Sequence, residues 1–222
     1  MIVVPSGLTG THSAESAAIT VDTRASSVSG MVYVAPGTAA GGSPTITEAF
    51  YIDTYEVTNE QMREVMQWAY DQGGLITASG STVRNAQGNQ KQLLDLDGSG
   101  QISFSGGTFS VDSGKGNYPC VEVTWYGAAA YCNYLSLKEG RTVAYDLSDW
   151  SLDTGASGYR LPNDAQWEYA ARGGKDGEDT EHSGSDTIGD VTWYTSNSGG
   201  HSHEVGTKAA NELGTFDMTG NV

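Results

Sequence analysis

The sequence has few cysteines, few basic residues and no long hydrophobic run. Two cysteines among 222 residues cannot make a disulfide framework, and they allow one bridge at most. Eleven Lys and Arg against 27 Asp and Glu give a formal net charge of -16, which repels a phosphate backbone and an anionic membrane surface. The negative charge therefore makes nucleic acid an unlikely partner. No apolar run of about 18 residues occurs, so no membrane span is expected.

Motifs for nucleophilic or phosphoryl chemistry are also missing. No Ser/His/Asp order, P-loop or paired-carboxylate motif stands out. His201 and His203 have no Cys or third His near them in sequence, so they are interpreted as surface residues of a Gly/Ser-rich loop. Trp125, Trp167 and Trp193 could form a sugar-binding platform, but their motifs favour packing in the core.

The length suits one sizeable domain, with a short segment before it. Residues 1–30 are rich in Ser, Thr and Ala without helical periodicity, and we interpret them as a leader or the end of a preceding module. No signal peptide is visible, because residues 1–5 are too short for its apolar region. Residues 17–23 are typical of a last strand, so we expect the true start upstream. The domain is predicted over 31–222.

Regular elements are predicted to be short. Strands are expected over 31–34 and 50–57, where aromatic and β-branched residues are frequent. Three helices are predicted. Capping boxes begin one after Thr58, which ends at the glycines 73–74, and one over 164–172 behind Asn163, and apolar spacing indicates one from Thr124 to near Gly140. Residues 77–92 form a polar stretch, and 144–159 and 173–191 are predicted to be mostly loop. Short elements and long connections indicate an α+β domain of low regular content.

A hairpin is predicted within residues 101–111. With Gly106-Gly107 as a two-residue turn, Phe104 faces Phe109 and Ile102 faces Val111. Every apolar residue then meets an apolar one, which fixes the register.

The segment before this hairpin matches the first part of a calcium loop. Oxygens of Asp95, Asp97, Ser99 and the Gln101 carbonyl occupy loop positions 1, 3, 5 and 7. Position 12 is a glycine instead of a bidentate Glu, and a hairpin follows instead of a helix. The loop is therefore either a calcium site closed by another carboxylate, for which Asp112 is a candidate, or an acidic turn.

Three blocks of sequence carry a family resemblance: FYIDTYEVTNEQ at 50–61, RLPNDAQWEYAARGG at 160–174 and NELGTFDMTGNV at 211–222. Together they resemble the formylglycine-generating enzymes, or sulfatase-modifying factors, from about residue 31 to residue 222. The resemblance implies a C-type-lectin-like core elaborated with extra loops. It breaks off where that family continues into its catalytic C-terminal third. We therefore expect a fragment of the domain that is incomplete at the C-terminus.

The resemblance also implies metal ligands. One calcium would be held by Asp217 and by the main-chain oxygens of Gly220 and Val222, and a second by Asn197 with the next carbonyl. Asp217 could instead cap a turn. Copper is expected only in the missing C-terminal part, because neither cysteine matches the family's copper-binding pair.

The cysteines have two interpretations. Relatives often have a cysteine matching Cys132, with its partner in the part absent here. Alternatively, Cys120 and Cys132 are buried thiols that pack as small hydrophobic residues.

For function, no catalytic residue is assigned and the chain alone is predicted to be inactive. The parent is expected to be an extracytoplasmic oxidoreductase acting on a sulfatase cysteine, with a protein or peptide as its partner. Two alternatives stay open. One is a non-catalytic lectin-like surface module that binds a ligand, and the other is a relative of the nonhaem-iron sulfoxide synthases. Fold alone does not decide among them.

Overall fold

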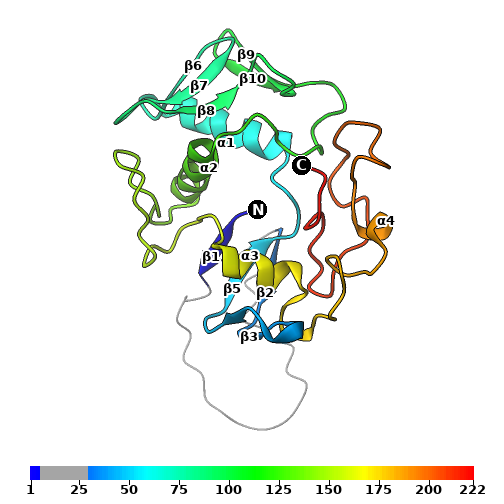
Figure 1. The fold of residues 1–222 in the computed structure, drawn as a ribbon. Helices are drawn as coiled ribbons and strands as arrows, with labels where there is room; N and C mark the ends of the chain where they lie inside the picture. The colour runs from blue at the N-terminus through cyan, green and yellow to red at the C-terminus, as the bar shows by residue number, and fades with distance from the viewer. Residues whose placement is uncertain (6–29) are drawn as a thin grey trace.

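The structure, a computed structural model, describes residues 1–5 and 30–222 (Figure 1). Its first sheet has three antiparallel strands in the order β1-β5-β2, which are β1 (Val3–Pro5), β5 (Phe50–Asp53) and β2 (Met31–Val34). Ile52 of β5 pairs with Val3 on one side and Val32 on the other. Residues 1–5 thus contribute to this sheet. The rest of the predicted leader, including the strand expected at 17–23, lies outside the described residues.

The strand predicted over 50–57 is shorter in the structure and ends at Asp53. The next residue, Thr54, still bonds on both sides, since its N–H donates to the Gly30 carbonyl and its carbonyl accepts from Phe216 N. The chain then leaves the sheet, and the Val57 carbonyl accepts from Cys120 N at 2.8 Å. The prediction of strand for 54–57 is therefore wrong, because these residues cross to the first helix.

Helix α1 (Asn59–Asp71) begins with the predicted capping box. Gln61 N donates to Thr58 Oγ1 at 3.3 Å, and Thr58 N donates to Gln61 Oε1 at 2.8 Å. The predicted apolar stripe of α1 is buried, and it consists of Met62, Val65, Met66 and Ala69. The helix ends before Gly73, whose φ of +70° suits glycine.

Helix α2 (Trp125–Lys138) covers the predicted range and ends before Gly140, and the structure shows that Thr124 caps it. It is buried on more sides than the predicted single stripe, because it packs between α1 and strand β8 (Gln92–Asp95). A Cβ at Gly127 would lie 2.1 Å from the Leu93 carbonyl oxygen. Glycine at this position therefore allows the helix to approach the strand closely.

A second sheet, in the order β6-β7-β8, was not predicted from the sequence. It consists of β6 (Ile76–Ala78), β7 (Thr82–Asn85) and β8, and its strands and their connections span the stretch interpreted as polar. The two buried positions of β7 are Val83 and Asn85. Because Asn85 is polar, the sequence of this strand lacks the alternation of apolar and polar residues that predicts a strand. The Asn85 side chain donates to the Gln87 carbonyl, which partly satisfies it.

The predicted hairpin is confirmed residue by residue. Strands β9 (Ile102–Ser105) and β10 (Thr108–Val111) pair Phe104 with Phe109 and Ile102 with Val111. Gly106 and Gly107 have φ values of +59° and +86°, as a type I′ turn requires. Gln67 of α1 fixes the hairpin, since its Oε1 accepts from Phe109 N at 2.8 Å.

The third predicted helix is α3 (Asp164–Ala171), and its capping box between Asn163 and Gln166 is present. Arg172 closes the helix and pairs with Glu168 at 3.0 Å. The remaining elements are short: β3 (Gly37–Thr38), η1 (Ala40–Gly42), β4 (Thr45–Ile46), η2 (Gly174–Asp176) and α4 (Ile188–Val191). The helix α4 lies at the end of a segment predicted to be mostly loop.

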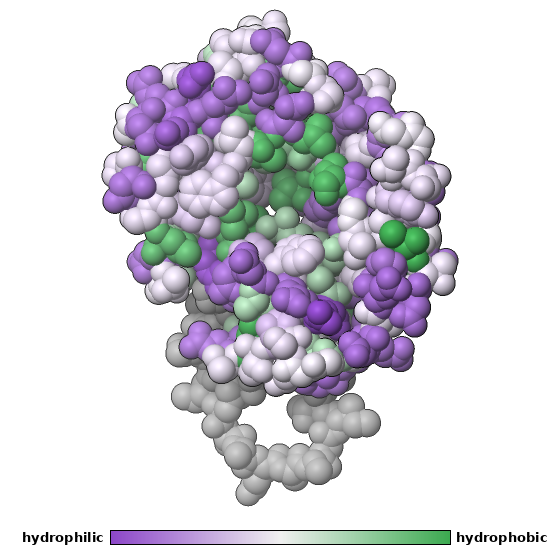
Figure 2. Space-filling view, viewed as in Figure 1, coloured by the Kyte–Doolittle hydropathy of each residue, from purple (hydrophilic) through white to green (hydrophobic). Residues whose placement is uncertain are grey.

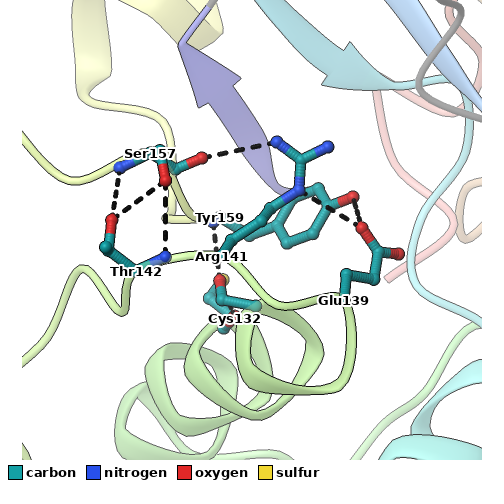
Figure 3. A network of polar contacts seen from close by, with 7 residues as sticks. Cys132, Glu139, Arg141, Thr142, Ser157 and Tyr159 are labelled. Atoms are coloured by element: carbon teal, nitrogen blue, oxygen red, sulfur yellow. Dashed lines mark hydrogen bonds and ion pairs between the residues drawn. The ribbon is translucent and has the colours of Figure 1, made fainter.

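A polar network ties the end of α2 to the segment that leads to α3 (Figure 3). Tyr159 N donates to Ser136 Oγ at 2.8 Å, and the Tyr159 hydroxyl donates to Glu139 Oε2 at 2.6 Å. The Arg141 guanidinium lies 5.0 Å from the Tyr159 ring centre. The next residue, Arg160, exchanges backbone hydrogen bonds with Val3 of β1. The network therefore connects the helical layer to the first sheet.

The buried apolar residues form two clusters, one around α1, α2 and the second sheet, and one around β5 and α3. This arrangement is an α+β fold of low regular content, which confirms the predicted fold class. Within the described residues, no helix is long and apolar enough to cross a membrane.

Candidate functional site

A cavity of about 490 Å³ lies between α1, α2, α3 and the C-terminal segment. Figure 2 shows a hollow at the centre of this face, with hydrophobic residues along its walls. Most lining side chains are apolar, and they include Val57, Met62, Val123, Tyr131, Leu161 and Met218. Two carboxyl groups, Glu56 and Asp217, line the same cavity. An acidic pair in an apolar cavity is the feature that any function must explain.

Asp217 is buried, with 8% of its surface exposed. Its Oδ2 accepts from Gly206 N at 2.7 Å, whereas its Oδ1 is buried without a hydrogen-bond partner among the described residues. An unpaired buried acceptor costs about 1–3 kcal/mol. Burial raises the pKa of the Asp217 carboxyl, and the hydrogen bond from Gly206 opposes the rise. The free oxygen is therefore a place where a donor or a cation would be stabilising.

Glu56 stands between β5 and α1, and Asn221 orients it. The Asn221 amide donates to Glu56 Oε2 at 2.7 Å, and Asn221 Oδ1 accepts from His203 N at 2.9 Å. Burial raises the pKa of Glu56 to about 7; the bond from Asn221 lowers it and the charge of Asp217 raises it. Sequence reasoning missed Glu56 because Asn221 is 165 residues away and no local spacing links them.

The two thiols are free and buried. Cys120 lines the cavity wall, and burial raises its pKa to about 12. Burial also raises the pKa of the Cys132 thiol well above its usual range. The interpretation of both as buried packing residues agrees with this geometry. Since the thiolate is the nucleophile and the metal ligand, neither thiol is prepared for either role.

The predicted calcium loop is a compact turn in the structure. Asp97 N donates to Asp95 Oδ1 at 2.9 Å, and Ser99 Oγ donates to Glu122 Oε1 at 2.8 Å. The Gln101 carbonyl accepts from Asp112 N at 2.9 Å. Glu122, which lies outside the loop sequence, thus contacts the loop. The sequence had suggested Asp112 as the closing carboxylate and gave no sign of Glu122. Its φ of +58° is unusual for a residue with a side chain.

These oxygens are of the type that calcium prefers, so the donor chemistry of the loop fits the ion. Among residues 1–5 and 30–222, however, no group of three or more His, Cys, Asp or Glu side chains is arranged as a metal site. Calcium binding by Asp95, Asp97, Ser99 and Gln101 therefore remains a prediction, and Glu122 is the carboxylate nearest to closing it.

The family resemblance implied two further calcium sites, one at Asp217, Gly220 and Val222 and one at Asn197, and the structure supports them only in part. Asn221 N donates to the Trp193 carbonyl at 3.1 Å, so the chain around Gly220 and Val222 runs beside 192–197. Asn197 closes its own turn, with Oδ1 accepting from Tyr194 N and Nδ2 donating to the Thr192 carbonyl. Its side chain is therefore already used, and it fits a calcium ligand poorly. Asp217 fits better through its unpaired Oδ1.

The three tryptophans that were predicted to pack in the core do not all do so. Trp125 is 52% exposed and Trp167 is 45% exposed, so packing in the core is wrong for these two. Trp167 lines the mouth of the cavity. Trp193 is half-buried and stacks on His203 at 3.7 Å between ring centres, with His201 at 5.1 Å from His203.

The structure is an α+β domain with two carboxyl groups in a mostly apolar cavity, and sequence comparison gives its family. The model of the sulfatase-modifying factor enzyme 1-like domain matches residues 16–222, so the chain belongs to that family. It is similar to a protein named chaperone protein LppX from Paenibacillus barcinonensis, with 32% identity over 66% of this chain and 61% of LppX. It is also similar to serine/threonine-protein kinase pkn1 of Chlamydia caviae, with 26% identity over 78% of this chain and 22% of pkn1.

Two solved structures have similar folds. CarF matches 85% of this chain and 76% of its own with a TM-score of 0.63 at 24% identity, which speaks for the fold alone. Treponema denticola variable protein 1 matches 86% of this chain and 70% of its own with a TM-score of 0.55 at 26% identity. The chain spans less than two thirds of LppX and about a fifth of pkn1.

Proposed function

We propose that this chain is a ligand-binding module, and that its binding site is the cavity of Glu56 and Asp217. The observation that carries the proposal is the pair of carboxyl groups, half-buried Glu56 and buried Asp217, that line a mostly apolar cavity of about 490 Å³, with one Asp217 oxygen unpaired among the described residues. Concave, mostly apolar sites with a few placed polar groups are typical of ligand binding. We further propose that the domain works outside the cytoplasm and that its ligand is part of a protein, a peptide or a surface molecule.

Thiol oxidation by this chain is the less favoured function. A copper–thiolate site needs soft sulfur ligands that converge at one point. Cys120 and Cys132 are buried thiols that belong to the same hydrophobic cluster, and burial keeps both protonated. We therefore expect no formylglycine in a sulfatase-derived cysteine peptide after incubation with this protein, copper and oxygen, as measured by mass spectrometry.

We also propose that calcium stabilises the module through the loop of Asp95 and Asp97. The support is the set of hard oxygens that the loop and Glu122 present together. In this role the ion would fix the turn between β8 and β9 and would take no part in ligand binding.

Binding of an uncharged, environment-sensitive dye such as Nile red tests the proposed site. Ala128 lines the cavity, so Ala128→Phe should fill it and weaken dye binding at least tenfold. Val143→Phe is the matched control, because it adds the same ring at a separate cavity of about 580 Å³ beside Leu137 and Leu152. Loss of binding in the control and not in Ala128→Phe would move the site to that second cavity.

A further inference from the structure

We propose that the ligand of this cavity carries a protonated amine on an apolar body, with the amine held between Glu56 and Asp217. The inference rests on the binding role proposed above and names its ligand class. Two carboxyl groups from distant segments line one cavity, and Asp217 Oδ1 has no partner among the described residues. An ammonium group donates three hydrogen bonds and carries the complementary charge.

The surroundings of the pair distinguish an amine from a metal ion. Calcium takes six to eight oxygen ligands, whereas the walls beside the carboxyls are carbon-rich side chains such as Val57, Met62 and Met218. Within the described part of the chain, no Lys, Arg or His side chain forms an ion pair with Glu56 or Asp217. A cation with an apolar body satisfies both the acidic pair and the walls.

This inference assigns Asp217 to the cavity instead of to the calcium set that the family resemblance implies.

Calorimetric titration with three ligands of equal length tests the inference: hexylammonium, 1-hexanol and hexanoate, at pH 8 with EDTA. Hexylammonium should bind at least tenfold more tightly than hexanol, and hexanoate should give no measurable binding. Glu56→Gln and Asp217→Asn should each reduce the preference for hexylammonium over hexanol to threefold or less. Glu60→Gln, at an exposed acid of α1 paired with Arg63, should preserve the wild-type preference.

Each other outcome overturns a definite part of the proposal. Equal binding of hexylammonium and hexanol, with Nile red binding intact, overturns the amine inference and leaves the binding module standing. If the wild type binds none of the three ligands and no Nile red, both the amine inference and the binding module are overturned. If the preference for hexylammonium over hexanol disappears when 1 mM calcium chloride replaces EDTA, Glu56 and Asp217 bind a metal ion instead of an amine. If Asp217→Asn does not fold, as judged by circular dichroism, Glu56→Gln alone decides.

Discussion

At the scale of single residues, burial controls the chemistry of the ionisable groups in this domain. Glu56, Asp53 and Cys120 all have pKa values raised chiefly by loss of solvation. These groups lie in two places: Glu56 and Cys120 line the cavity, and Asp53 accepts from Ile2 N at 3.1 Å at the end of β5. Such groups respond to pH and to reagents in ways that exposed groups do not.

The reactivity of the thiols follows from their burial. With a pKa of about 12, Cys120 is a thiolate in about one molecule in 10⁴ at pH 8. We expect Ellman's reagent to modify both cysteines at least 100-fold more slowly in the native protein than in guanidinium. A modification rate in the native protein within threefold of the rate in guanidinium would show that a thiol is accessible, and a catalytic role for that thiol would again be open.

Asp53 gives a pH dependence whose sign is fixed. Burial raises its pKa from 3.8 to about 6, so the native state binds this proton more tightly than the unfolded state. Its contribution to stability is complete below pH 3.8 and is lost as pH rises through 6. Relative to Asp53→Asn, the wild type should therefore lose free energy of unfolding between pH 4 and pH 7 in urea titrations. A constant difference across this range would contradict the raised pKa.

At the scale of elements, local signals determined the parts that were predicted correctly. The two capping boxes, and the matched apolar pairs of β9 and β10, each specify one structure. Strand β7 escaped prediction because Asn85 is buried where an apolar residue is expected. The alternation and the aromatic and β-branched content of 50–57 predicted one strand over the whole range, whereas the ladder of β5 ends at Asp53.

The turn of the hairpin can be tested by one substitution. Gly106 has a φ of +59°, and nothing lies within 4 Å of a Cβ placed there. Gly106→Val should therefore destabilise by about 1 kcal/mol or more through backbone strain and not through a clash. The control is Gly80→Val, at a glycine with open space and no positive φ. Equal thermal melting of both variants would argue against the turn geometry.

The calcium loop gives the second prediction at this scale. Saturating calcium should raise the melting temperature by mass action relative to EDTA. The double variant Asp95→Asn with Asp97→Asn should abolish the rise, and Glu122→Gln should reduce it, because Glu122 contacts Ser99 at 2.8 Å. Asp112→Asn serves as a control and should keep the full effect. A rise that survives the double variant would place the ion elsewhere.

At the scale of the whole molecule, the candidate site depends on contacts that no local pattern contains. Family blocks at 50–61 and 211–222 included Glu56 and Asp217 without indicating that they share a cavity. The resemblance suggested Asp217 as a metal ligand, whereas Glu56 entered only through the fold. The net charge was equally uninformative, because Glu56 and Asp217 are two of 27 acidic residues.

A crystal structure of the protein with bound hexylammonium tests the central claim, that the cavity is the binding site, most directly. The account predicts density for the alkyl chain against Met62 and Met218, with its nitrogen within hydrogen-bonding distance of Glu56 and Asp217. Density found only in the cavity beside Leu137 and Leu152, or none at saturating ligand, would contradict it.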